Sequence, residues 1–211
     1  RDAQESRGLG DVYKRQIDTV QKRIYGYNPV HRIYQGWGEP AGYSGHFIID
    51  YQKDPCDFGT FHADSLFPGQ TKIGHEKNIG IYIGFHVESH EQILVKAASS
   101  FTDRTGAEQN LQQEIPHWNF DQTRKELTAI WEKHLSAIEV ETPDQEAKEK
   151  FYGAFYRASF LPRTFNDVDG RYPAFAQQDS ILQLAQNETY YDDFSMWDTY
   201  RALHPLINLL Y

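Results

Sequence analysis

The sequence predicts an α+β protein in which antiparallel strands come first and helices follow. Up to about residue 103, apolar residues alternate with small or polar ones, and Gly and Pro interrupt the pattern often. From about residue 104, apolar residues recur at the three- and four-residue spacing of an amphipathic helix. Because strands and helices do not alternate along the chain, a doubly wound parallel sheet is excluded.

The composition is that of a globular protein. Of the 211 residues, 39% are hydrophobic and 24% are charged, which are ordinary fractions for a folded domain. The chain is long enough to bury a core. No run of about 18 apolar residues occurs, so we expect no membrane-spanning helix. A net charge of −9 without a basic block argues against nucleic acid as a partner. The single cysteine, Cys56, excludes an internal disulfide and a cysteine-based zinc site.

The aromatic content is high, at 15%, with 14 Tyr, 13 Phe and 4 Trp. Two interpretations stay open. Large aromatic side chains fill cores, and they also line sugar-binding clefts, where the apolar face of a pyranose stacks on a ring.

Three segments in the first part of the chain have the period of a strand: 46–51, 78–87 and 91–101. The polar stretch 88–92 between the last two predicts a hairpin loop. Several short strands separated by turns are typical of an antiparallel sandwich.

Helices are predicted in the second part. Residues 105–115 form a short helix that Pro116 closes, and Asp121 is placed as the N-cap of a second. The apolar stripe of that second helix consists of Leu127, Ile130, Trp131, Leu135 and Ile138.

A capping box at residues 142–145, with Thr142 as the cap, predicts a third helix that Pro162 ends. Residues 166–172 predict a turn. The last helix is expected to start near residues 193–195 and to run toward Leu210, with a kink at Pro205.

Two groups of acidic or imidazole side chains leave alternatives open. His86, Glu88 and His90 alternate, so they either meet a metal ion or form a solvated strand end, which is the simpler account. Residues 167–170, Asp-Val-Asp-Gly, resemble the opening of a calcium loop, but the closing Glu is replaced by Gln178. A plain Asp-Gly turn is the favoured interpretation.

The run Trp197-Asp198-Thr199-Tyr200-Arg201 offers the strongest site candidate. Asp198 in the first turn of a helix can accept hydrogen bonds from sugar hydroxyls. Trp197 can stack on the sugar ring, and Arg201 can hold the carboxylate in place. The alternative is a purely structural role, in which Asp198 lies at the N-terminal end of a helix, Trp197 in a core and Arg201 on the surface.

Several motifs together resemble glycoside hydrolase family 92, from about Ile17 to Tyr211. These motifs are Asn28–Gly38, Ala41–Gly45, Ala107–Leu111, Trp131, Phe151–Arg157, Phe194–Arg201 and His204–Leu206.

The resemblance implies a calcium-dependent exo-α-mannosidase that acts on N-glycans or mannans. Members invert the anomeric centre, with an acid and a base carboxyl about 6.5–9.5 Å apart. Most are secreted or surface enzymes of bacteria, so a periplasmic or extracellular location is expected. Their fold is a β-sandwich joined by linker helices to an (α/α)6 toroid.

On this basis we expect a two-domain fragment truncated at both ends. Residues 1–16 resemble translated adapter sequence and are expected to be a non-native leader. Residues 17–103 are assigned to part of the N-terminal β-sandwich, 104–142 to linker helices, and 143–211 to the start of an incomplete (α/α)6 catalytic domain.

The resemblance places the general acid and base beyond residue 211, and most calcium ligands as well. We therefore expect no catalytic residue and no metal ligand in this chain, and no activity from the fragment alone. Asp198, Trp197 and Arg201 are the expected sugar-binding residues for mannose-containing glycans. Two alternatives remain, a non-catalytic carbohydrate-binding sandwich and another sandwich–toroid glycosidase or phosphorylase.

Overall fold

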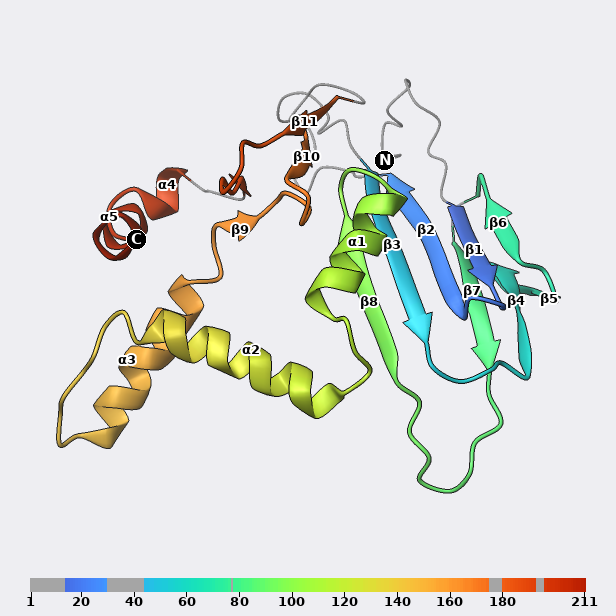
Figure 1. Cartoon of the computed structure of the whole chain (residues 1–211), viewed down its shortest axis with the longest axis horizontal. Helices are drawn as coiled ribbons and strands as arrows, with labels where there is room; N and C mark the ends of the chain where they lie inside the picture. Colours follow the sequence, from blue (N-terminus) through green and yellow to red (C-terminus); the bar gives the residue numbers. More distant parts are fainter. Residues whose placement is uncertain (1–13, 30–43, 77, 175–179, 193–195) are drawn as a thin grey trace. The chain divides into compact units, whose positions relative to one another are not determined.

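The computed structural model describes residues 14–29, 44–76, 78–174, 180–192 and 196–211 (Figure 1). The chain forms two compact units. The first comprises the residues up to Trp118 together with Asn166–Glu188, and the second comprises Asn119–Phe165 together with Thr189–Tyr211. The backbone therefore enters the second unit, returns to the first and leaves it again. Among the described helices, none has both the length and the apolar character needed to cross a membrane.

Two antiparallel sheets build most of the first unit (Figure 1). The five-stranded sheet has the order β6 (Lys72–Gly74), β1 (Lys14–Asp18), β2 (Arg23–Pro29), β3 (Ser44–Tyr51) and β8 (Val95–Ser100). The three-stranded sheet has the order β5 (Ser65–Pro68), β4 (Asp57–His62) and β7 (Ile79–Gly84). The predicted antiparallel strands ahead of the helices are thus confirmed, whereas the sandwich packing of the sheets stays a prediction.

The predicted hairpin between β7 and β8 is wrong. β7 pairs with β4, with Gly84 opposite Asp57, and β8 pairs with β3, with Val95 opposite Tyr51. The polar stretch closes on itself instead, because the Glu91 carboxylate accepts a hydrogen bond from the backbone N–H of Glu88 at 2.8 Å. A polar stretch indicates that the chain turns, but it does not identify the strand with which the next segment pairs.

The first strand begins ahead of the predicted sandwich boundary at residue 17. Lys14 lies opposite Tyr27 of β2 and opposite Gly74 of β6, so residues 14–16 are paired on both sides. Ile17 in the same strand is 2% exposed. The boundary therefore falls inside a strand, and the origin of the residues ahead of it stays a prediction.

Helix α1 (Arg104–Glu114) covers one face of the five-stranded sheet (Figure 1). Ala107 and Leu111 lie one turn apart on the same side of the helix and pack with Ile48 of β3 into a core in which all three are fully buried. This confirms the helix predicted at residues 105–115.

A short hairpin returns to the first unit from the helical part of the chain. It consists of β10 (Arg171–Pro173) and β11 (Ile181–Gln183). The turn predicted at residues 166–172 is confirmed, since the backbone N–H of Gly170 donates to the carbonyl of Asp167 at 2.9 Å. Gly170 has φ of +83°, a conformation that glycine adopts at little cost.

The second unit is mainly helical, and aromatic contacts join its helices. The ring centres of Trp131 and Tyr156 are 4.5 Å apart, and the His134 ring stacks on the Tyr211 ring with 4.9 Å between their centres. Its elements are α2 (Phe120–Leu135), α3 (Gln145–Ala158), β9 (Arg163–Thr164), β12 (Tyr191–Asp192), α4 (Met196–Thr199) and α5 (Leu203–Leu210).

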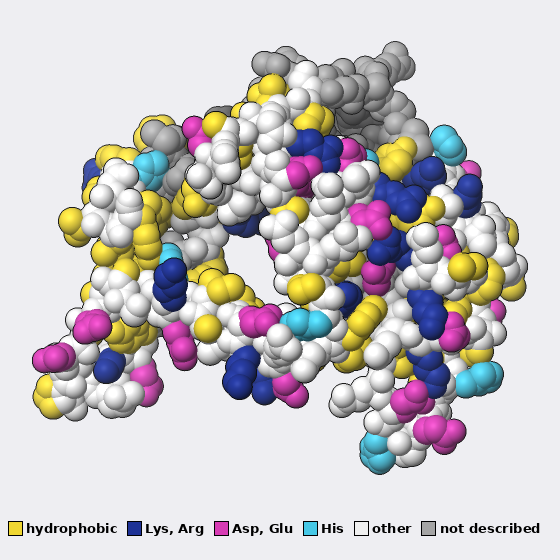
Figure 2. Space-filling model, viewed as in Figure 1, with side chains coloured by type: hydrophobic (Ala, Val, Ile, Leu, Met, Phe, Trp, Pro, Cys, Tyr) yellow, Lys and Arg dark blue, Asp and Glu magenta, His cyan; other side chains and the backbone are white. Residues whose placement is uncertain are grey.

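Large apolar side chains remain exposed on this unit, and Figure 2 shows yellow side chains gathered over its helices. In the stripe predicted for α2, Leu127 is 54% exposed and Ile130 is 65% exposed, while Leu209 of α5 is 81% exposed. The helical spacing of the stripe is confirmed, but this surface is not a core within the unit. A toroid stays a prediction.

Both predicted helix caps are displaced by two residues. Helix α2 is capped by Asn119 instead of Asp121, and α3 by Asp144 instead of Thr142. In each case the observed cap accepts a hydrogen bond from the backbone N–H three residues on. Each sequence offers two capping side chains two positions apart, so residue type alone does not decide between them.

The last predicted helix is divided into α4 and α5, and the break precedes Pro205. Residues 200–202 separate the two helices, and Pro205 lies in the first turn of α5. A proline is tolerated there because the first backbone N–H groups of a helix have no partner within it. The interruption expected from Pro205 is thus found as a break one turn ahead of the proline, and not as a kink at the proline itself.

Candidate functional site

Helix α4 carries the predicted sugar-binding residues Trp197 and Asp198. Trp197 is 89% exposed and Asp198 is exposed as well. Trp197 is thus not part of a core among the described residues, and its role as a sugar-stacking residue stays a prediction. An exposed indole beside an exposed carboxylate offers both a stacking surface and a hydrogen-bond acceptor to a ligand.

Arg201 follows α4 and is engaged by its neighbour. Its Nε donates to the hydroxyl of Tyr200 at 2.6 Å, and its guanidinium lies 5.4 Å from the centre of that ring. That Arg201 also holds the Asp198 carboxylate, as the sequence suggested, stays a prediction. Both side chains are exposed.

Sequence reasoning missed the residue that anchors this run, Thr199. Its side chain is buried, at 6% exposure, and its hydroxyl lies 2.7 Å from Nε2 of His204. The two residues are five positions apart, which matches neither helical nor strand spacing. No local rule therefore pointed to this pair.

A second polar cluster, in the first unit, centres on Asp167. This residue is 3% exposed, and its carboxylate accepts hydrogen bonds from the hydroxyls of Ser100 (2.7 Å) and Thr102 and from the amide of Asn110 (2.8 Å). A buried carboxylate with this many donors is satisfied by the protein itself. Sequence reasoning placed Asp167 in a turn and missed this network, since the donors come from distant parts of the chain.

The same turn does not fit a calcium ion. The Asp167 carboxylate is held by protein donors, and that of Asp169 accepts a hydrogen bond from Nε of Arg171 at 2.7 Å. Across the described residues, no three acidic, His or Cys side chains gather in a way that could hold a metal. The plain-turn interpretation is thus the one that the structure supports.

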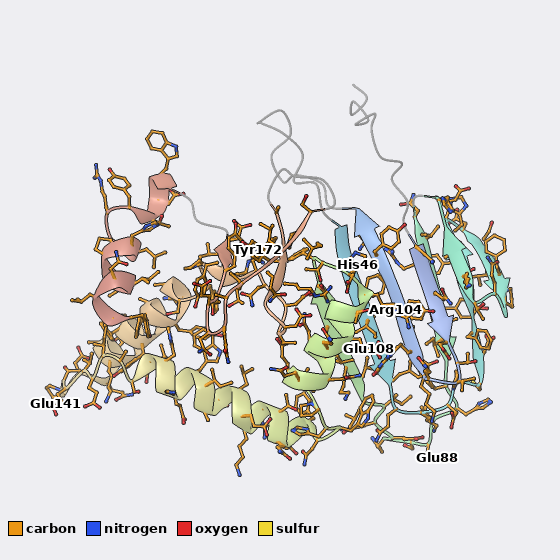
Figure 3. The ribbon with its side chains drawn as sticks, turned by 45° about the horizontal axis from the view of Figure 1, so that its top comes forward. His46, Glu88, Arg104, Glu108, Glu141 and Tyr172 are labelled. Atoms are coloured by element: carbon orange, nitrogen blue, oxygen red, sulfur yellow. The ribbon has the colours of Figure 1, made fainter. Side chains whose placement is uncertain are left out.

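Charges beside this cluster are paired. Arg171 donates to Asp103 at 2.7 Å, which lowers the pKa of the Asp103 carboxyl and raises the pKa of the Arg171 guanidinium. His46, labelled with Tyr172 and Arg104 in Figure 3, lies at the end of β3 opposite Ser100. Burial lowers the pKa of His46, while the charges of Asp103 and Asp167 oppose this shift. The arrangement is that of a structural network at the end of the sheet.

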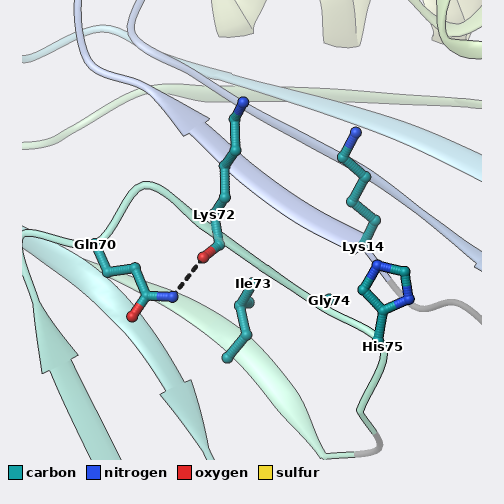
Figure 4. Close-up of a pocket in the computed structure, with 6 residues that line it drawn as sticks. All are labelled: Lys14, Gln70, Lys72, Ile73, Gly74 and His75. Atoms are coloured by element: carbon teal, nitrogen blue, oxygen red, sulfur yellow. Dashed lines mark hydrogen bonds between the residues drawn. The ribbon is translucent and has the colours of Figure 1, made fainter.

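Two surface hollows offer no catalytic pair. One, of about 330 Å³, lies beside β6 and is lined by Lys14, Lys72 and His75 without an acidic residue (Figure 4). The other, of about 500 Å³, lies at the β10–β11 hairpin. Its two carboxylates are engaged, that of Asp169 by Arg171 and that of Glu188 by the backbone N–H of Ala185 at 3.2 Å.

The alternating side chains of His86, Glu88 and His90 lie beyond the end of β7 and are all exposed. They form no metal-binding group within the described part of the chain. The solvated interpretation of these residues is the one that the structure supports.

Residues 106–211 match the sequence model described as the glycosyl hydrolase family 92 catalytic domain. No curated protein sequence matches the chain.

Among solved structures, the chain is similar to a family GH92 inverting mannosidase from Bacteroides thetaiotaomicron VPI-5482, with a TM-score of 0.81 and 24% identity over 94% of this chain and 26% of that one. It is also similar to a GH92 alpha-mannosidase from the same species, with a TM-score of 0.79 and 30% identity over 93% of this chain and 26% of that one. The structure of that alpha-mannosidase in complex with mannoimidazole has a TM-score of 0.79 and 29% identity, over 93% of this chain and 25% of that one. The chain thus spans about a quarter of the length of these structures.

Proposed function

The chain belongs to glycosyl hydrolase family 92, and from this premise we propose that the whole protein is a glycoside hydrolase that releases terminal α-linked mannose. One observation carries the proposal. Residues 106–211 match the catalytic-domain model, and 93% of the chain aligns at 30% identity with an alpha-mannosidase structure.

We propose hydrolysis with inversion. Inversion needs an acid that protonates the leaving oxygen and a base that activates water from the opposite face, about 6.5–9.5 Å apart. We assign neither role to residues 1–211. Among the described carboxylates, that of the buried Asp167 accepts hydrogen bonds from Ser100 and Asn110, and that of the half-buried Asp50 pairs with Arg23 at 2.6 Å.

The run on α4 is proposed to bind the terminal mannose. Asp198 accepts hydrogen bonds from sugar hydroxyls, and Trp197 stacks against the ring. Arg201 is proposed to have a more remote role, because its Nε donates to the hydroxyl of Tyr200. The exposure of Trp197 and Asp198 supports this proposal, since neither side chain packs into a core among the described residues.

Calcium dependence is proposed for the whole protein from the family resemblance alone. No three Asp, Glu, His or Cys side chains come together as a metal site in the described part of this chain, so no step of the reaction is derived through the ion. N-glycans or mannans are the proposed substrates, and a periplasmic or cell-surface location is proposed on the same ground.

The test uses the protein expressed from its full reading frame and an α-linked mannobiose. We expect release of mannose, with the β-anomer as the first product in a time-resolved proton NMR spectrum. The 211-residue chain assayed in parallel is expected to release none. Retained configuration or the absence of mannose release would defeat the proposal.

Two further measurements separate the alternatives. A dependence on inorganic phosphate, with mannose 1-phosphate as product, would instead identify a phosphorylase. Binding of the glycan without cleavage would identify a carbohydrate-binding module.

A further inference from the structure

We infer that Thr199 and His204 are positioning residues that fix Trp197 and Asp198 for sugar binding, an inference that rests on the proposed function. The hydroxyl of Thr199 and Nε2 of His204 are 2.7 Å apart. Neither is proposed to contact the sugar. Their role is to hold the short helix α4 against α5.

Helix α4 is too short to be stable by itself. It comprises Met196–Thr199, whereas isolated helices shorter than about 12 residues are marginal in water. The backbone helix does not continue into α5, because residues 200–202 separate the two. The hydrogen bond between Thr199 and His204 spans this break and ties the last residue of α4 to the first turn of α5.

The burial pattern of α4 shows what the tether orients. Successive residues of a helix point about 100° apart, so Trp197 and Thr199 point about 160° apart, to nearly opposite sides. In agreement, Thr199 is 6% exposed and Trp197 is 89% exposed. Anchoring Thr199 therefore turns Trp197 outward and sets Asp198 between them, at the edge of the exposed side.

Loss of the tether leaves the chemistry of Trp197 and Asp198 unchanged but frees their orientation. A displacement of about 1 Å in a substrate-positioning group can reduce the rate by about 100-fold. The tether thus affects sugar binding through Asp198, which is the behaviour of a positioning residue.

The test compares three variants of the full-length protein on an α-linked mannobiose. Thr199→Val keeps the shape of the side chain and removes the hydroxyl, and we expect kcat/KM to fall by about 10- to 100-fold. Thr199→Ser restores the hydroxyl and is expected to stay within about threefold of the native value. The matched control is Thr128→Val, since the Thr128 hydroxyl donates to the Arg124 carbonyl at 2.8 Å on the exposed face of α2. We expect it to leave kcat/KM unchanged.

Asp198→Asn separates the inference from the proposed function. If Asp198→Asn lowers kcat/KM and Thr199→Val does not, the positioning role is overturned and the sugar site stands. If Asp198→Asn has no effect either, the assignment of the sugar site fails first.

A second pair of variants covers the case in which Thr199→Val does not fold. His204→Gln keeps a side-chain amide that can hydrogen-bond the Thr199 hydroxyl, whereas His204→Leu does not. We expect activity to be retained better in His204→Gln. Equal activity of the two variants, measured with folded protein, would overturn the inference.

Discussion

The hydroxyl of Ser100 donates a hydrogen bond of 2.7 Å to the carboxylate of Asp167, although 67 positions separate the two residues. Ser100 ends β8, and Asp167 opens the segment that returns from the helical unit. Because Asp167 is 3% exposed, this contact lies inside the first unit. A segment from the second part of the sequence is thereby an integral part of the strand-rich unit.

Replacing Asp167 by Ala should destabilise the first unit by about 2–4 kcal/mol. The substitution leaves the buried donors of Ser100 and Asn110, and the half-buried hydroxyl of Thr102, without their common acceptor. Urea denaturation followed by circular dichroism measures the loss. The control is Asp169→Ala on the same turn, whose carboxylate pairs with Arg171 at a partly exposed position and contributes less than about 1 kcal/mol. Equal losses in both variants would contradict the role assigned to Asp167.

Gly106→Ala should also be destabilising, by about 1–3 kcal/mol, although alanine favours helices. A methyl group at Gly106 would overlap Asp167 Oδ2 and lie 2.7 Å from the Ser100 hydroxyl. Gly153→Ala in α3 is the matched comparison, because its methyl group would meet only the flexible end of Arg157 at 3.4 Å. That variant should gain up to about 1 kcal/mol. Thermal unfolding of the two proteins should therefore shift in opposite directions, and a gain at Gly106 would show that the cluster is not close-packed.

Stability at acid pH should depend on Arg171. The hydrogen bond from Arg171 holds the pKa of the Asp103 carboxyl below its unfolded value of about 3.9. The folded state therefore gains stability from this carboxylate above pH of about 4 and loses it as the pH falls through the lower folded pKa. Since 44% of the Asp103 side chain is exposed, the gain is below about 1 kcal/mol. In Arg171→Gln, the free energy of unfolding should fall less steeply below pH 4, and identical pH profiles would exclude the pair as the cause.

The order of elements was predictable from the sequence, whereas their pairing was not. The period-two segments became β3, β7 and β8, because alternation follows from the pleat of a single strand. Which strands are neighbours depends on contacts across the whole unit, so the hairpin expected between β7 and β8 was wrong. The helix caps were displaced for a related reason, since Asn119 and Asp121 are both suitable by residue type.

The candidate site was predictable only where its residues are consecutive. Trp197 and Asp198 stand together in one motif, and their exposure agrees with a ligand-binding role. The contact of Thr199 with His204 needs a break between two helices, and the network of Asp167 needs the return of a distant segment. Neither arrangement leaves a periodic pattern in the sequence.

Removal of calcium should lower the activity of the whole protein without altering the fold of this chain. Among the described residues, no three Asp, Glu, His or Cys side chains come together as a metal site. A ligand that does not bind the folded state does not stabilise it. We therefore expect EGTA to reduce mannose release and added calcium to restore it, while the melting temperature of the 211-residue chain shifts by less than about 1 °C. A large shift for this chain would place calcium ligands within it.

Asp198→Ala in the full-length protein should sharply reduce mannose release and leave the melting temperature nearly unchanged. Asp198 is exposed on α4, so its loss removes no core packing. Loss of an acceptor for sugar hydroxyls should lower kcat/KM by about 10- to 100-fold, equivalent to about 1–3 kcal/mol. Asp121→Ala is the control, because this exposed carboxylate in the first turn of α2 pairs with Arg124 at 3.0 Å, a surface pair of small energetic value. It should change neither quantity, and unchanged kinetics in Asp198→Ala would remove this residue from the mannose site.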